Sequence, residues 1–254
     1  MLSVGQDTLI VILIVAFSQL FVLLMNRFWP VPKRSEHNDI IGWQLGILGT
    51  TYAVIMGFML YTVWTNFGVA ELNADSEANA LISVYRLADG LPEPQRDQIK
   101  QEARTYADTV VNEDWPAMSA GVQPPFQSRE PTRKMWAILM TVKTASPTQL
   151  TAEDHSLYEL STLTEDRQMR QLQSISRIPG ILWFVLIVGG AVTIASSCMF
   201  GTANSSLHAY QVFSFSLLIA LVLIAIADID RPFQGSVHVQ KTAFLRAESS
   251  MQEQ

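Results

Sequence analysis

Four long apolar stretches, separated by one polar region, dominate the pattern of hydrophobic and polar positions along the chain. They span residues 9–25, 40–64, 181–200 and 209–227. The hydrocarbon core of a bilayer is about 30 Å thick and requires roughly 20 apolar residues in a helix. The first stretch lacks the basic start and the small-residue cleavage pattern of a signal peptide, and Phe28 and Trp29 can extend it to the interface. The pattern therefore predicts an all-α polytopic membrane protein with four transmembrane helices.

The second apolar stretch continues without a stop signal into residues 67–178, which show helical rather than strand periodicity. Small and apolar residues recur there every three or four positions: Ala70, Ala74, Ala78, Leu81, Tyr85 and Ala88. One helix is therefore expected over residues 41–88, roughly 70 Å long at 1.5 Å per residue, with its end at the sequence GLPEP.

Three further helices are predicted in this middle region. The second helix is expected to close at NEDWPAM, and the third follows the loop GVQPPFQSREP. The fourth begins at Thr151, where Asp154 completes a capping-box-like pair, and continues towards Pro179. The apolar stripes are Ile99, Ala103, Tyr106 and Val110 in the second helix, Trp136, Leu139 and Val142 in the third, and Leu157, Leu160, Leu172 and Ile175 in the fourth.

These elements divide the chain into spans one and two (1–66), a helical extramembrane domain (67–178), spans three and four (179–230) and a C-terminal tail (231–254). Only 16% of the 254 residues are charged, against roughly 25% in soluble domains. The net charge of −6 arises mostly in the middle region, and no basic run of the kind that binds nucleic acid is present. The single cysteine, Cys198, is expected to be a small buried packing residue.

The orientation in the membrane follows from the basic residues near the ends of the spans. The linker after the first span holds Arg27, Lys33 and Arg34. The opposite side collects Arg167, Arg170, Arg177, Arg231, Lys241 and Arg246. The balance favours both termini and the middle domain in the cytoplasm, although the first linker favours the reverse.

Residues suited to catalysis or metal binding do not form a recognisable pattern. The histidines at positions 37, 155, 208 and 238 lie far apart, and there is no glycine-rich phosphate loop or nucleophile elbow. Asp166 and Arg170 are four residues apart, as expected for an ordinary surface pair on a helix. We therefore expect no enzyme, no cofactor and no bound metal.

The second span carries two opposed stripes. Its small residues, which allow close helix packing, are Gly42, Gly46, Gly49, Ala53 and Gly57. About 180° around the helix lies a stripe that is polar at both ends and apolar in the middle: Gln44, Leu48, Thr51, Ile55, Met59, Thr62 and Asn66. An apolar constriction between polar vestibules is typical of a gated pore, but polar residues also gather wherever a helix meets the interfaces. If Glu71, Asp75 and Glu77 faced such a conduit, they would favour cations.

A polar cluster of Asp228, Asp230, Arg231 and Pro232 closes the fourth span. Because proline lacks an amide donor, it is expected to stop the helix there. Two carboxylates fall short of the six to eight oxygens that calcium prefers. The cluster is therefore interpreted as a structural helix exit, with a regulatory role as the alternative.

The run DRPFQGSVHVQKTAF after the last span resembles the closing signature of the bacterial bestrophin-like membrane proteins, a family otherwise of unknown function. The segment EANALISVYRLADGLPEPQRDQIKQEARTYADTVVNEDWPAMSAG resembles the cytoplasmic portion of that family. The residues that fit its pattern are Glu77, Tyr85, Arg86, Leu91, Pro92, Arg96, Tyr106, Glu113, Trp115 and Pro116. The resemblance extends from the first span to Phe244.

This resemblance implies the arrangement of bestrophins proper, which are pentameric anion channels with four membrane helices per subunit and cytoplasmic termini. It also implies that the second membrane helix lines the pore. The chain has no clear counterpart of the aromatic hydrophobic neck or of the acidic calcium clasp, which leaves calcium gating, anion selectivity and the pentamer open.

Two principal hypotheses follow. The first is an oligomeric ion channel in the lipid bilayer that conducts small ions along the second span. The alternative is a non-conducting scaffold or accessory subunit that uses the small-residue stripe to bind another membrane protein, since no ionisable residue lies within the spans. An intramembrane enzyme would need a catalytic pair inside the spans, and none is found.

Overall fold

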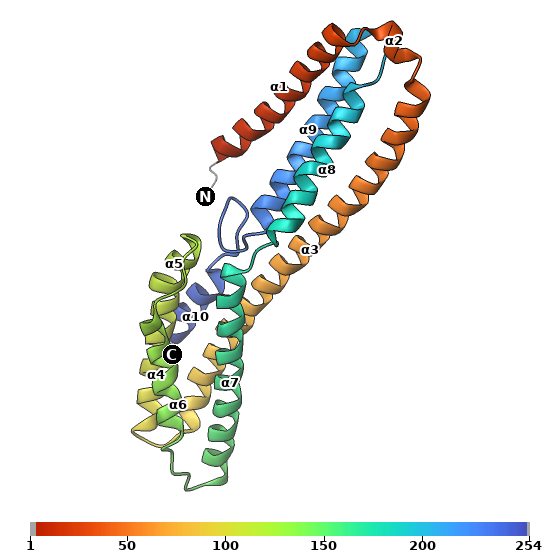
Figure 1. The fold of residues 1–254 in the computed structure, drawn as a ribbon. Coiled ribbons are helices and arrows are strands. Elements are labelled where there is room, and N and C mark those ends of the chain that lie inside the picture. Colours follow the sequence, from red (N-terminus) through yellow and green to blue (C-terminus); the bar gives the residue numbers. More distant parts are fainter. Residues whose placement is uncertain (1–3, 253–254) are drawn as a thin grey trace. The chain divides into compact units, whose positions relative to one another are not determined.

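Helices and their connections, without any strand, make up the part of the chain that the computed structural model describes, residues 4–252 (Figure 1). The chain folds as two compact units. The apolar unit comprises the chain up to Thr65 together with Arg177–Asp230. The helical unit comprises Asn66–Ser176 together with the chain from Arg231 onward. A single helix of 50 residues, α3, contributes its first part to one unit and its second part to the other.

The apolar unit contains all four predicted spans. Its helices are α1 (Val4–Phe28), α2 (Val31–Ser35), the first part of α3 (Asn38–Leu87), α8 (Gly180–Cys198) and α9 (Ser205–Ile229). In the described residues, α1, α3, α8 and α9 are each long and apolar enough to cross a membrane. The prediction of four membrane helices is confirmed.

Tyr52 of α3 holds the centre of the apolar unit together. Its hydroxyl donates to the carbonyl of Leu186 on α8 at 2.9 Å. The side chain lies against Gly189 and Gly190, where an added Cβ would come 2.8 Å from a ring carbon and 2.8 Å from the hydroxyl oxygen, respectively. Met56 and Val63, four and eleven residues after Tyr52, continue the same buried face against α8 and α9. The two glycines therefore allow an aromatic ring to lie directly on the backbone of α8.

Polar contacts tie α2 and the start of α3 to the end of α8. The Arg34 side chain is fully buried, bonds to Asn26, and donates to the carbonyl of Cys198 at 3.2 Å. Asn38 and Gly201 exchange two hydrogen bonds, at 2.7 and 2.9 Å. Cys198 itself is buried, as expected for a packing residue.

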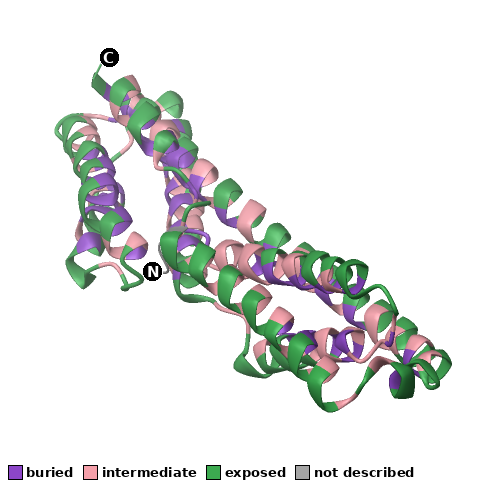
Figure 2. Cartoon of the chain, turned by 90° about the horizontal axis from the view of Figure 1, so that it is seen from above, coloured by how far each residue is buried: buried purple, intermediate pink, exposed green. Residues whose placement is uncertain are grey.

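The helical unit is built around the second part of α3. Its other elements are the 3-10 turn η1 (Ala88–Gly90), α4 (Gln95–Thr109), the π-helical turn η2 (Val110–Asp114), α5 (Trp115–Ser119), the 3-10 turn η3 (Phe126–Arg129), α6 (Glu130–Leu139), α7 (Pro147–Ile175) and α10 (Thr242–Gln252). Buried residues form stripes along these helices (Figure 2). The predicted stripe of α3, from Ala70 to Ala88, and that of α4, from Ile99 to Val110, are buried as expected.

Of three local predictions in this unit, one holds to within a residue and two are wrong. The second helical segment ends at Ser119, directly after NEDWPAM, because the π turn carries the chain from α4 into α5. The fourth helix starts before Thr151, at Pro147, because Ser146 caps it by accepting a hydrogen bond from the Gln149 amide. Leu172 and Ile175 are 59% and 41% exposed, since the inner face of α7 there carries polar side chains instead.

Candidate pore helix and buried ion-pair cluster

The face of α3 that packs against its own chain lies between the two predicted stripes. Tyr52, Met56 and Val63 occupy that face. Among the stripe predicted to line a pore, the polar residues Gln44, Thr51, Thr62 and Asn66 are exposed, and Leu48, Ile55 and Met59 are half-buried. Ile55 and Met59 touch the edge of the core around Tyr52. Most of the predicted stripe is therefore not covered by packing within the chain.

The stripe of small residues is also open along most of its length. A Cβ added at Gly46, Gly49 or Gly57 would meet nothing within 4 Å in the described residues. Gly42 alone approaches a neighbour, the Phe200 ring, at 3.3 Å. Ala53 is exposed. The stripe is therefore free to contact a helix of another chain or lipid, and its predicted role in helix packing stays a prediction.

The polar cluster at the end of α9 takes part in local backbone contacts. The helix ends at Ile229, before Pro232. The Asp230 carboxylate accepts a hydrogen bond from the Ile178 amide at 3.0 Å, at the entry to α8. Past the proline, Val239 donates to the Pro232 carbonyl at 2.7 Å, which closes the DRPFQGSV loop. These contacts favour the structural interpretation, which stays a prediction.

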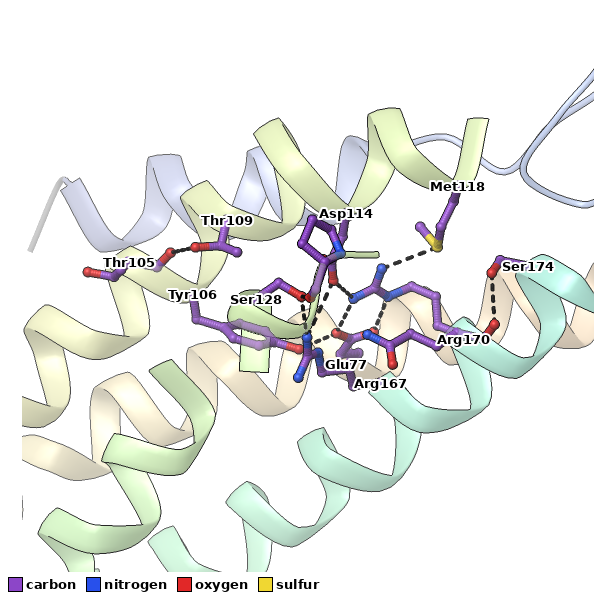
Figure 3. Close-up of polar contacts among 12 residues, drawn as sticks. Glu77, Thr105, Tyr106, Thr109, Asp114, Met118, Ser128, Arg167, Arg170 and Ser174 are labelled. Carbon is purple, nitrogen blue, oxygen red and sulfur yellow. Dashed lines mark hydrogen bonds and ion pairs between the residues drawn. The ribbon is translucent and has the colours of Figure 1, made fainter. Parts of the chain in front are cut away.

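A cluster of ionised side chains that sequence reasoning missed lies inside the helical unit (Figure 3). Arg170 of α7 bonds to both carboxylate oxygens of Glu77 on α3, at 2.6 and 3.0 Å. The same guanidinium reaches Asp114, the last residue of the π turn, at 3.0 Å. All three side chains have no exposed surface. We call these residues, with Arg167 and Tyr106, the buried ion-pair cluster.

Arg167 and Tyr106 complete this cluster. Arg167 lies 3.8 Å from the Asp114 carboxylate and donates to the Ser128 hydroxyl at 2.7 Å. The Tyr106 hydroxyl donates to Glu77. Two carboxylates and two guanidiniums cancel in formal charge, so the cluster is neutral as a whole. A buried set of charges is tolerated only when it is paired and hydrogen-bonded in this way.

The surroundings of the cluster shift the pKa values of Tyr106 and Arg170. Burial, followed by the negative charge of Glu77, raises the pKa of Tyr106 well above its ordinary value. Burial by itself would lower the pKa of Arg170, but the Glu77 carboxylate more than offsets that effect and raises it. Tyr106 therefore stays a neutral donor and Arg170 a cation at any physiological pH.

Aromatic side chains from distant parts of the chain cover Arg170. Its guanidinium lies 5.5 Å from the Trp115 ring and 5.7 Å from the Phe244 ring, which is cation–π range. Trp115 also contacts Phe233 edge-on, with 5.7 Å between ring centroids. The two sequence segments that carry the family resemblance thus meet in space: Glu77, Tyr106 and Trp115 come from one, and Phe233 and Phe244 from the other.

The prediction that Asp166 and Arg170 form a surface pair is wrong. Arg170 is completely buried and pairs with Glu77 and Asp114 instead. A signal for this was present in the sequence, because Arg167 and Arg170 continue the helical spacing of Leu160 and Leu163 on the inner face of α7. Arginine on an apolar stripe indicates a buried partner, which periodicity alone does not identify.

Burial of Glu77 also corrects the idea that it could face a conduit, since its carboxylate is engaged by Arg170 and Tyr106. Glu71 remains exposed and Asp75 half-exposed. Within residues 4–252, no group of three or more His, Cys, Asp or Glu side chains is placed to hold a metal ion.

Comparison with known proteins identifies the family of this arrangement. A family model described as the bestrophin-like domain matches residues 12–244. One similar crystal structure is that of a bacterial bestrophin homologue from Klebsiella pneumoniae that carries a leucine-to-threonine mutation. It has a TM-score of 0.68 at 10% identity, and the match covers 96% of this chain and 98% of the other.

A second crystal structure of a Klebsiella pneumoniae bestrophin homologue, phased by Zn-SAD, has a TM-score of 0.66 at 11% identity, with coverage of 95% and 97%. A point mutant described simply as a membrane protein has a crystal structure with a TM-score of 0.67 at 10% identity, with coverage of 96% and 97%. At such low identity these structures establish a shared fold. No curated protein matches the sequence. Because the family match spans nearly the whole chain, the protein is a member of the bestrophin-like family.

Proposed function

We propose that the protein is an oligomeric ion channel in which α3 lines the pore. The observation that carries this proposal is the division of α3 into three faces. One face packs on α8 and α9 through Tyr52, Met56 and Val63, which leaves most of the polar–apolar–polar stripe and the small-residue stripe for other surroundings. In a closed ring, the first of these stripes would line the conduit and the second would pack against a neighbouring subunit.

The constriction of this pore would lie at Ile55 and Met59, the apolar middle of the stripe. Replacing Ile55 by serine should wet the constriction and raise the conductance of the reconstituted protein several-fold. The matched control is Val54→Ser, because Val54 is the preceding residue, is 52% exposed and belongs to neither stripe. Unchanged currents in Ile55→Ser, or equal increases in both variants, would reject α3 as the pore lining.

The subunit number decides between the channel and its alternative. Native mass spectrometry of the nanodisc-reconstituted protein should give a closed homo-oligomer, with a pentamer expected from the family resemblance. A monomer, or a stoichiometric complex with another membrane protein, would favour the non-conducting scaffold, because the open glycine stripe could equally receive a foreign helix.

We further propose that the termini and the helical unit lie in the cytoplasm of a bacterial inner membrane. Three of the basic side chains that bear on orientation, Arg34, Arg167 and Arg170, are buried and have structural partners. Setting them aside leaves Arg27 and Lys33 on one side against Arg177, Arg231, Lys241 and Arg246 on the other. A C-terminal fusion to a fluorescent protein that folds only in the cytoplasm should fluoresce, and a dark, stable fusion would reverse the orientation.

A further inference from the structure

A pocket of about 810 Å³ lies on the helical unit, between η3, α6 and α7. Its lining includes three arginines, Arg129, Arg133 and Arg167, and one carboxylate, that of Glu130. Glu130 offsets one of these charges and Asp114, behind the wall, offsets that of Arg167, which leaves a formal charge of +1 at the pocket. We propose that this pocket binds a small organic anion in which a phosphate or carboxylate group is attached to a flat apolar part.

Two buried polar groups on the pocket wall have no protein partner. Thr132 and Arg167 are each 5% exposed, and among the described residues Thr132 Oγ1 and Arg167 Nε make no hydrogen bond. By contrast, Thr164 of α7 donates its hydroxyl to the carbonyl four residues earlier. Both atoms lie just beneath the pocket surface, and a small side-chain shift that brought them to an acceptor in the pocket would relieve the cost of a buried donor left unpaired.

The other residues that line the pocket match the charged group and the apolar part of the proposed ligand. Arg133 forms two hydrogen bonds with Glu130, at 2.8 and 3.1 Å. That bonding lowers the pKa of Glu130 and raises that of Arg133, so both stay ionised. Guanidiniums favour phosphate and carboxylate because their planar donors match two oxygens at once. The rings of Phe126 and Trp136 offer a surface for a flat apolar group.

Arg167 connects this pocket to the buried ion-pair cluster. Its Nη2 atom donates to Ser128 and lies 3.8 Å from Asp114, which in turn binds Arg170. An anion that binds to Arg167 would therefore compete with Asp114 for the same guanidinium. Occupation of the pocket is expected to change the stability of the helical unit as well as its charge.

Isothermal titration of the full-length purified protein with phenyl phosphate tests this proposal. Phenyl phosphate should bind with a dissociation constant below a millimolar, and both inorganic phosphate and uncharged benzyl alcohol should bind more weakly. Arg133→Ala should weaken phenyl phosphate binding about tenfold. The matched control is Lys134→Ala, which removes the neighbouring positive charge of α6 from a different face, where Lys134 pairs with Glu102.

Thr132→Val separates a ligand site from a merely structural hydroxyl. Because the hydroxyl has no partner within residues 4–252, the substitution should leave the thermal midpoint of the ligand-free protein unchanged or raised, while phenyl phosphate binding falls about tenfold. The proposal is overturned if the wild-type protein binds no phenyl phosphate at millimolar concentration. Equal affinities of Thr132→Val, Arg133→Ala and Lys134→Ala would overturn it as well.

Discussion

The two units of the chain are held together by different means. In the apolar unit, large side chains such as Phe17, Trp43 and Phe58 are about 70% exposed, and the buried core is small. In the helical unit, the core is a broad cluster of alanines, tyrosines and leucines that encloses two carboxylates and two guanidiniums. The exposed surface of the apolar unit is therefore suited to lipid, and that of the helical unit is suited to water.

This difference changes where apolar side chains lie along a single helix, α3. In the first part of α3, apolar side chains point outward as well as inward, because lipid offers no penalty for their exposure. In its second part, the burial of small residues such as Ala70, Ala74 and Ala78 allows α3 to lie close to its neighbours. The same helix therefore follows two packing rules on the two sides of residue 65.

The largest effect is expected where the helical unit buries charge. Arg170→Met removes the cation that Glu77 and Asp114 share and leaves two carboxylates without compensation inside the core. Loss of one partner from a buried ion pair costs about 3–5 kcal/mol, so the thermal midpoint of the purified protein should fall sharply.

Arg246→Met is the control for that loss. Arg246 also pairs with an aspartate, Asp75, at 3.7 Å, but it is 73% exposed. A surface substitution of this kind should change the free energy of unfolding by no more than about 0.5 kcal/mol. Similar midpoints for the two variants would mean that burial does not distinguish the two ion pairs, and the contrast between core and surface would fail.

A smaller effect is expected from overpacking the apolar unit. Gly189→Ala places a methyl group 2.8 Å from the Tyr52 ring and should cost about 1–3 kcal/mol. Gly46→Ala is the control, because nothing lies within 4 Å of the added atom. The thermal midpoint of Gly189→Ala should be clearly lower than that of Gly46→Ala. Adding Tyr52→Leu to Gly189→Ala should recover part of the lost stability. Equal midpoints would contradict close contact of α3 with α8.

The smallest effect concerns a single hydrogen bond in the cluster. Tyr106→Phe removes the hydroxyl that donates to Glu77, while Arg170 still binds that carboxylate, so about 1–2 kcal/mol should be lost at neutral pH. The pKa of Tyr106 is raised in the folded protein. Its contribution is therefore complete below the unfolded pKa of about 10 and is lost as the pH rises towards the folded-state value.

Alkaline titration of the two proteins checks the sign of this effect. The difference in unfolding free energy between the wild type and Tyr106→Phe should be constant from about pH 6 to about pH 9 and shrink at higher pH. A difference that grows with pH would show that the tyrosine is not held in its neutral form.

Much of the fold could be predicted because it depends on local pattern. Apolar length identified the membrane helices, and helical spacing identified the buried stripes of α3 and α4. The start of α7 was misplaced because both Ser146 and Thr151 offer a capping side chain, and only the observed hydrogen bond from Gln149 distinguishes them. The C-terminal half of the inner face of α7 was misassigned. The prediction placed Leu172 and Ile175 on that face, whereas Arg167 and Arg170 are the buried residues.

The sequence by itself determined the class of this protein and the number of its membrane helices, because hydrophobic length and helical period are properties of neighbouring residues. It indicated the family through two segments that resemble the bestrophin-like pattern. The buried ion-pair cluster was decided only by the tertiary structure. Glu77 and Arg170 lie 93 positions apart, and Asp114 and Arg170 lie 56 apart. Whether such charges are solvated or enclosed depends on which helices meet, and the energy of a charge changes by several kcal/mol between those two environments.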